Sequence, residues 1–153
     1  MNIKFKLKNI LVVGCLVIFM IAFLGYSKKN QLLNTEYIVK NFREIYQLKI
    51  LSMNDLEDKD SITVKNIMES EIDTLTYLLD DTNDKELYSL ISDYIIQLNI
   101  ELEVENSKGK DKEENKRIVE NSLYKRLDIL YTLIDDYNLN LQIKDEVKED
   151  IRL

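Results

Sequence analysis

An uninterrupted apolar run from Ile10 to Tyr26 is the strongest pattern in the chain. Three lysines precede the run, and a serine and two lysines follow it. The run has 17 residues, and a helix of roughly 17–25 apolar residues is long enough to span a bilayer. We therefore expect residues 10–26 to contact membrane lipid.

The flanking charges predict how this segment is oriented. Because cytoplasmic flanks carry an excess of Lys and Arg, the three lysines before the run favour a cytoplasmic N-terminus. We therefore expect residues 1–29 to be a membrane anchor or signal segment and residues 30–153 to be an extracytoplasmic domain of a single-pass membrane protein.

Two alternatives remain open at this segment. Gly25 and Ser27 are the small residues that signal-peptide cleavage after Ser27 would need, and such cleavage would release a secreted module. The apolar run is longer than the usual 7–15 residues of a signal peptide. Residues 12–15 (VVGC) resemble the box before the lipidated cysteine of bacterial lipoproteins, although apolar residues continue after Cys15.

The remainder of the chain shows the periodicity of amphipathic helices. Apolar residues recur every three or four positions in four stretches, and a shorter fifth stretch follows. The stripes are Ile38, Phe42, Ile45 and Leu48; Val64, Met68, Ile72, Leu75 and Leu79; Leu87, Ile91, Tyr94, Leu98 and Leu102; Val119, Leu123, Leu127, Leu130, Ile134 and Tyr137; and Val147 and Ile151. Asp60 or Ser61 can cap the second helix, and Asn83 or Asp84 the third.

This pattern predicts an all-α protein. Proline is absent, and only one glycine follows residue 29, so nothing breaks the helices except short polar links. Matched lengths and short links favour an N-terminal transmembrane helix followed by an up-down antiparallel bundle of about four helices and a short C-terminal helix. With no breaker after Gly25, the first helix is expected to continue out of the membrane into the bundle.

Composition excludes several kinds of chemistry. Residues 28–153 contain 18 basic and 28 acidic side chains, a net charge of −10, which argues against binding nucleic acid. Histidine is absent and Cys15 is the only cysteine, so the usual zinc sites and intramolecular disulfides cannot form. The three glycines are too few for a glycine-rich phosphate loop. We therefore expect no cofactor and no enzymatic activity.

An internal similarity links residues 61–83 with residues 116–138, at an offset of 55 positions. It includes paired aspartates near the end of each helix, Asp80-Asp81 and Asp135-Asp136. A duplicated helical hairpin or a shared packing requirement would each explain the similarity. In an up-down bundle these two helices are parallel, so both aspartate pairs are expected at the same end of the bundle.

The paired aspartates are the sharpest candidate metal ligands in the sequence. Carboxylate oxygens suit Ca²⁺ or Mg²⁺, so Asp80, Asp81, Asp135 and Asp136 together are a hypothetical divalent-cation site. The alternative is that these residues belong to solvated turns beside the cap of the next helix.

The layout of a basic start, one span and a helical domain is similar to the ligand-binding regions of bacterial chemoreceptors. Those regions continue into a second span and a signalling segment, whereas this chain stops at Leu153, so we expect it to act through a partner. The expected function is a membrane-anchored, non-enzymatic sensor, adaptor or structural protein with a protein partner or a homo-oligomeric state. A secreted binding module and a carboxylate-based metal protein or enzyme are the alternatives.

Overall fold

The computed structural model describes the backbone of residues 3–54, 61–107, 112–139 and 141. Within these ranges, side chains are described for residues 18–51, 62–107, 112–139 and 141. The described residues form four helices, α1 (Ile3–Asn54), α2 (Ser61–Asp80), α3 (Lys85–Asn106) and α4 (Lys112–Tyr137), and contain no strand. The prediction of an all-α protein is confirmed. The short helix predicted around Val147 and Ile151 lies outside the described residues.

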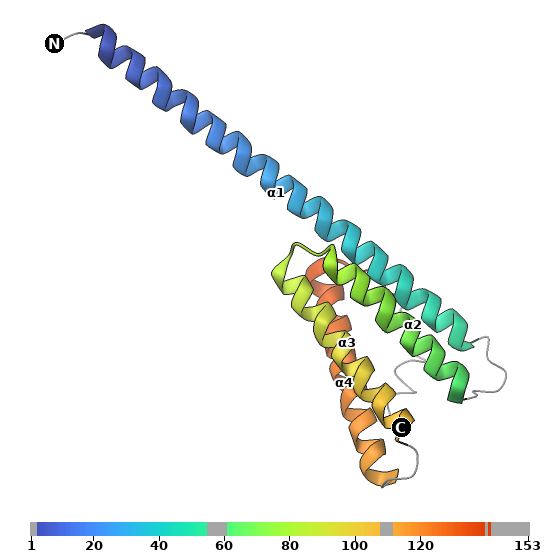
Figure 1. Ribbon diagram of the computed structural model, residues 1–153. Coiled ribbons are helices and arrows are strands. Elements are labelled where there is room, and N and C mark those ends of the chain that lie inside the picture. The colour runs from blue at the N-terminus through green and yellow to red at the C-terminus, as the bar shows by residue number, and fades with distance from the viewer. Residues whose placement is uncertain (1–2, 55–60, 108–111, 140, 142–153) are drawn as a thin grey trace.

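The first helix is unbroken over 52 residues, which corresponds to about 78 Å at the usual rise of 1.5 Å per residue. Its C-terminal half packs into the bundle, and its N-terminal half projects well beyond the other helices (Figure 1). The predicted continuation of this helix past Gly25 is therefore confirmed. Within the part of the chain that the structure describes, no helix is long and apolar enough to cross a membrane. Side chains 10–17 of the predicted span are outside that part.

The four helices alternate in direction, and α3 lies between α2 and α4 (Figure 1). The first helix packs mainly on α2 and touches α4 only slightly. Because α3 has neighbours on two sides, its predicted stripe is the best buried, with Leu87, Ile91, Tyr94 and Leu98 each 0% exposed. The bundle and its apolar core are confirmed.

Two predicted stripes are displaced in the structure. Leu48, assigned to the core of the first helix, is 64% exposed, and Tyr46 is buried instead. The buried line of α4 is formed by Ser122, Arg126, Leu130 and Leu133. Most of the predicted stripe of α4 is only half-buried, namely Val119, Leu123, Leu127, Ile134 and Tyr137. The side of α4 that faces α3 is buried. Because α4 contacts α1 only slightly, its more apolar side lies at the edge of the bundle and is half-buried.

The turn between α2 and α3 is hydrogen-bonded to α1 near the position where α1 begins to pack on the bundle. Asp84 is the N-cap of α3, and its Oδ1 accepts hydrogen bonds from the backbone N–H groups of Glu86 and Leu87 at 3.0 and 3.1 Å. Asn34 of α1 donates to the carbonyl of Asp81 at 2.8 Å and accepts from the N–H of Asn83 at 3.0 Å. Of the two caps that the sequence allowed for this helix, Asp84 is the one that forms.

Candidate interaction surface and buried polar network

Six polar side chains from all four helices meet inside the bundle, and we call them the polar network. They are Lys49 of α1, Glu71 of α2, Tyr94 and Glu101 of α3, and Ser122 and Arg126 of α4. The set contains two basic and two acidic side chains, so its formal charge is balanced. A buried charge is costly unless it is paired and hydrogen-bonded, so the connections between these groups decide whether the core is stable.

The pair between Lys49 and Glu71 holds α1 to α2. The Lys49 ammonium lies 2.7 Å from Glu71 Oε2, and the two side chains are only 11% and 2% exposed. The other oxygen, Glu71 Oε1, accepts a hydrogen bond from the hydroxyl of Tyr94 at 3.2 Å. The carboxylate of Glu71 therefore connects three helices.

The pair between Arg126 and Glu101 holds α4 to α3. The guanidinium donates from Nε to Glu101 Oε1 and from Nη2 to Oε2, each at 2.8 Å, in the bidentate geometry that gives strong pairs. Its Nη1 also donates to the hydroxyl of Tyr94 at 3.3 Å. The hydroxyl of Ser122 lies 2.9 Å from Glu101 Oε1 and 2.8 Å from the carbonyl of Gln97, so it can donate to either.

Tyr94 joins the two pairs. Its hydroxyl donates to Glu71 and accepts from Arg126, while the Arg126 guanidinium carbon lies 5.5 Å from the centre of its ring. Phe42 of α1 packs against the ring of Tyr94 in an edge-to-face arrangement, with a centroid separation of 5.3 Å and an interplanar angle of 76°. This contact holds the Tyr94 ring in position. The network is thus one connected unit rather than two isolated ion pairs.

Burial and neighbouring charges shift the pKa values of three groups in the network. Burial and the nearby charge of Glu71 raise the pKa of Tyr94 well above its ordinary value, so its hydroxyl remains protonated and able to donate. Burial alone would lower the pKa of Arg126, but its interactions with Tyr94 and Glu101 outweigh that effect and raise the pKa. Burial and the positive charge of Arg126 lower the pKa of Lys49, and Glu71 opposes this change.

The polar network follows the internal similarity of the sequence. Glu71 and Arg126 are separated by the same 55 positions that relate the two matching segments. They carry opposite charges and reach the same tyrosine hydroxyl from α2 and α4, the two helices that flank α3. The corresponding leucines, Leu75 with Leu130 and Leu78 with Leu133, are buried on both helices. The two segments therefore occupy equivalent positions on either side of α3.

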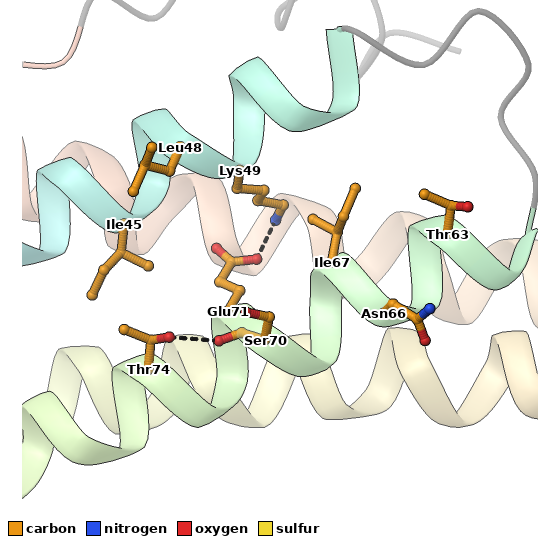
Figure 2. Close-up of a pocket in the computed structure, with 9 residues that line it drawn as sticks. All are labelled: Ile45, Leu48, Lys49, Thr63, Asn66, Ile67, Ser70, Glu71 and Thr74. Carbon is orange, nitrogen blue, oxygen red and sulfur yellow. Dashed lines mark hydrogen bonds and ion pairs between the residues drawn. The ribbon is translucent and has the colours of Figure 1, made fainter.

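A groove between α1 and α2 lies over one end of the network, and we call it the α1–α2 groove. It consists of two adjoining cavities of about 300 and 270 Å³ that share Ile45, Leu48 and Thr74. Figure 2 shows the first cavity, in which Lys49 points from α1 toward Glu71 on α2, with Ile67 and Asn66 further along α2. The second cavity extends the groove to Tyr37 and Tyr77. Mixed apolar and polar walls of this kind suit the side chains of another protein.

The four aspartates of the hypothetical cation site are all exposed. The hydroxyl of Tyr137, at the end of α4, lies 3.5 Å from Asp84 Oδ1, in the turn that follows α2. The C-terminal ends of α2 and α4 therefore lie at the same end of the bundle, as predicted (Figure 1). Burial and the charges of Asp84 and Glu86 raise the pKa of Tyr137 to about 12. Among the residues that the structure describes, no three His, Cys, Asp or Glu side chains are grouped so that they could hold a metal ion. The cation site at Asp80, Asp81, Asp135 and Asp136 stays a prediction.

Sequence reasoning missed the polar network because its members do not resemble a motif. Glu71 interrupts an apolar line of four-residue spacing between Ile67 and Leu75. Arg126, 55 positions later, likewise precedes a buried leucine, Leu130, by four positions. A charge at such a position in two matching helices was a usable signal of an internal pair. Four tyrosines outside the apolar stripes, Tyr77, Tyr88, Tyr124 and Tyr131, are 76%, 47%, 58% and 43% exposed.

No protein-family model, curated protein or solved structure matches the chain. The proposals that follow therefore rest on the residues, the helices and their geometry.

Proposed function

We propose that this chain is a membrane-anchored, non-enzymatic protein whose extracytoplasmic helical bundle acts by contacts with other proteins. The observation that carries the proposal is the projecting part of α1. There, consecutive apolar side chains are exposed on every side of one rigid helix. They are Ile18, Phe19, Met20, Ile21, Phe23, Leu24 and Tyr26, each 62–73% exposed.

A helix at the surface of a water-soluble domain has a single apolar side, whereas one that is apolar all round needs a core or a bilayer around it. The bundle does not cover this part of α1, because its first hydrogen bonds to α1 are at Asn34. Burying each large apolar side chain is worth roughly 1.5–3 kcal/mol. If residues 10–26 are inserted into a bilayer, lipid surrounds all of these exposed apolar side chains at once.

The anchor would place the bundle against the membrane surface. Tyr26 and Asn34 are eight positions apart in an unbroken helix, which corresponds to about 12 Å. The turn between α2 and α3 and the end of α4 would then face the lipid headgroups. The opposite end of the bundle and the α1–α2 groove would be available to partners in the extracytoplasmic space.

The proposed mode of action is recognition rather than catalysis. The charges inside the bundle pair with one another in the polar network, and the chain has no histidine to serve as a general base at neutral pH. The exposed rings of Tyr37 and Tyr77 lie at one end of the α1–α2 groove, and tyrosine is among the residues that dominate binding energy at protein interfaces.

Fractionation of cells that express the full chain, followed by intact mass measurement, tests the anchor. We expect the full-length mass in the membrane fraction. A mass that begins at Lys28, recovered from the medium, would contradict the anchor and establish the secreted alternative.

A matched pair of variants makes the test sharper. The double variant Ile18→Asp/Ile21→Asp puts two charges near the middle of the run, where each costs about 2.5–3.5 kcal/mol of insertion free energy. We expect it to leave the membrane fraction. Tyr77→Asp also adds a charge at an exposed position, but on the bundle, and we expect this control to remain in the membrane fraction.

A further inference from the structure

We propose that two copies of this chain pair in parallel through one continuous stripe of exposed side chains on α1, which we call the α1 stripe. The stripe begins in the apolar segment and extends along the bundle. Its members are Phe19, Phe23, Tyr26, Leu33, Tyr37, Leu48 and Leu51, each 53–73% exposed. This inference rests on the proposed membrane anchor and names the partner and the surface that the anchored protein uses.

The stripe is straight. Its members are separated by 3, 4, 7 or 11 positions, and each of these intervals is close to a whole number of turns at 3.6 residues per turn. Phe19 and Tyr37 are 18 positions apart, as are Leu33 and Leu51, and 18 residues make five turns. Two straight helices can therefore touch along the whole stripe, over about 48 Å at 1.5 Å per residue.

Most of the stripe faces away from the bundle, and two of its members, Tyr37 and Leu48, lie at the border with the α1–α2 groove. The core contacts of α1 are made by Ile38, Phe42 and Tyr46, which are 0%, 1% and 7% exposed and lie on the other side of the helix. Figure 1 shows the three shorter helices on one side of α1. Two copies can therefore bring their first helices together without collision of their bundles.

Charge favours this surface over the rest of the domain. Residues 28–153 carry a net charge of −10, so two copies repel each other over most of the surface of this region. Between residues 18 and 51, the only charged side chain in line with the stripe is Glu44. The ammonium of Lys40 lies 3.8 Å from Glu44 Oε1, which compensates that charge.

The anchor determines the relative orientation of the two copies. Chains inserted in one membrane with the same topology have parallel first helices at the same height. A two-fold pairing then brings each stripe residue against its own counterpart, as an isologous interface requires. The apolar side chains of the stripe in one copy are thus covered by the same side chains of the second copy. Asn30, a polar position within the stripe, would favour this register, as single asparagines do in coiled coils.

Disulfide crosslinking of the full-length protein tests the pairing. In a Cys15→Ser background, single cysteines are introduced by Leu33→Cys, Tyr37→Cys or, as the matched control, Glu36→Cys. Glu36 is exposed and adjacent to Tyr37 but is turned about 100° away from the stripe. After mild oxidation of membranes, we expect a crosslinked dimer at positions 33 and 37 in several-fold higher yield than at position 36.

A second pair of variants excludes random collision. With Leu51→Cys as the reporter, Tyr37→Asp would place two like charges against each other and lower the crosslinking yield several-fold. Tyr88→Asp, on α3, would leave the yield unchanged. Equal yields at positions 33, 36 and 37, or a yield at position 51 that does not respond to Tyr37→Asp, would overturn the pairing.

The outcome of this experiment is separable from that of the anchor. If the protein is in the membrane fraction and the stripe positions do not crosslink preferentially, only the pairing fails. If the protein is released with a mass that begins at Lys28, the anchor fails, and the same cysteines in the released protein show whether the stripe still pairs.

Discussion

At the scale of single residues, Tyr94 and Arg126 show how a small bundle tolerates charge in its core. Arg126 is 8% exposed and has both carboxylate oxygens of Glu101 and the hydroxyl of Tyr94 as acceptors. Isolated buried charges cost several kcal/mol, and a well-paired set roughly recovers that cost. The value of the network is therefore specific orientation of the helices more than added stability.

This reasoning predicts an asymmetric response to substitution of the Glu101–Arg126 pair. Glu101→Ala leaves the buried guanidinium without its carboxylate, so we expect the free energy of unfolding to fall by about 3–5 kcal/mol. The double variant Glu101→Leu/Arg126→Met replaces both charges by apolar groups of similar length and should recover most of that loss.

Urea denaturation of the bundle, followed by circular dichroism, measures both effects. Lys116→Ala serves as the control, because its ion pair with Glu120 is exposed and worth at most about 0.5 kcal/mol. If the double variant is no more stable than Glu101→Ala, the ion pair adds to the free energy of unfolding beyond the mutual neutralisation of its two charges, and the prediction is wrong.

At the scale of elements, the helix termini near the turn between α2 and α3 set the geometry of the bundle. Asp84 caps α3 through two backbone N–H groups, and Asn34 ties the same turn to α1. At the end of α4, Asn138 adopts a φ of 53°, a left-handed conformation that asparagine tolerates better than most residues. The next residue, Leu139, is buried and packs into the core.

The cap predicts a selective effect of removing one of two neighbouring carboxylates. Asp84→Ala leaves two N–H groups of α3 without their acceptor, and we expect a loss of about 1 kcal/mol in the free energy of unfolding. Asp81→Ala, three positions earlier, removes a side chain that caps nothing and should change stability by less than about 0.5 kcal/mol. Thermal unfolding of the two variants distinguishes them, and equal losses would contradict the assignment of Asp84 as the cap.

At the scale of the whole molecule, α1 serves two parts of the protein at once. Its C-terminal half is one of the four helices of the bundle, and its N-terminal half presents the apolar segment. Because the helix is continuous, the orientation of the bundle is coupled to that of the apolar segment. A tilt or rotation of the apolar segment would therefore be transmitted directly to the bundle.

This coupling predicts the effect of a break placed between the two halves. Asn30→Pro removes a backbone donor and kinks the helix at a cost of about 3 kcal/mol, but it precedes the first hydrogen bond between α1 and the bundle, at Asn34. We expect the bundle to unfold at an unchanged temperature while the two halves of α1 lose their fixed alignment.

Spin labels at positions 19 and 37, in protein diluted with unlabelled chains, measure that alignment. An unbroken helix separates these positions by about 27 Å, and we expect a single narrow distance distribution in the parent and in the control Asn30→Ala. Asn30→Pro should shorten and broaden it. An unchanged distribution in Asn30→Pro would show that the continuity of α1 does not depend on this turn.

The helical class and the approximate helix positions follow from the sequence alone. Absence of proline, scarcity of glycine and the apolar spacing leave few alternatives to helices near those observed, and both aspartate pairs were correctly expected at one end of the bundle. These features depend on local backbone preferences and on periodicity, which can be read directly along the chain.

Periodicity identified the buried side of α3, where Leu87 and Ile91 are 0% exposed, but tertiary structure decided which side of α1 and α4 is buried. Periodicity assigned Leu48 to the core, yet it is exposed, and it gave no role to Arg126, which is buried. A helix buries the side that faces its neighbours, and α1 and α4 barely touch, so part of their apolar surface stays outside. The partners of Glu71 and Arg126 are likewise set by how α2 and α4 pack on α3. Burial and long-range pairing depend on the arrangement of all four helices in space, and no single stretch of sequence contains that information.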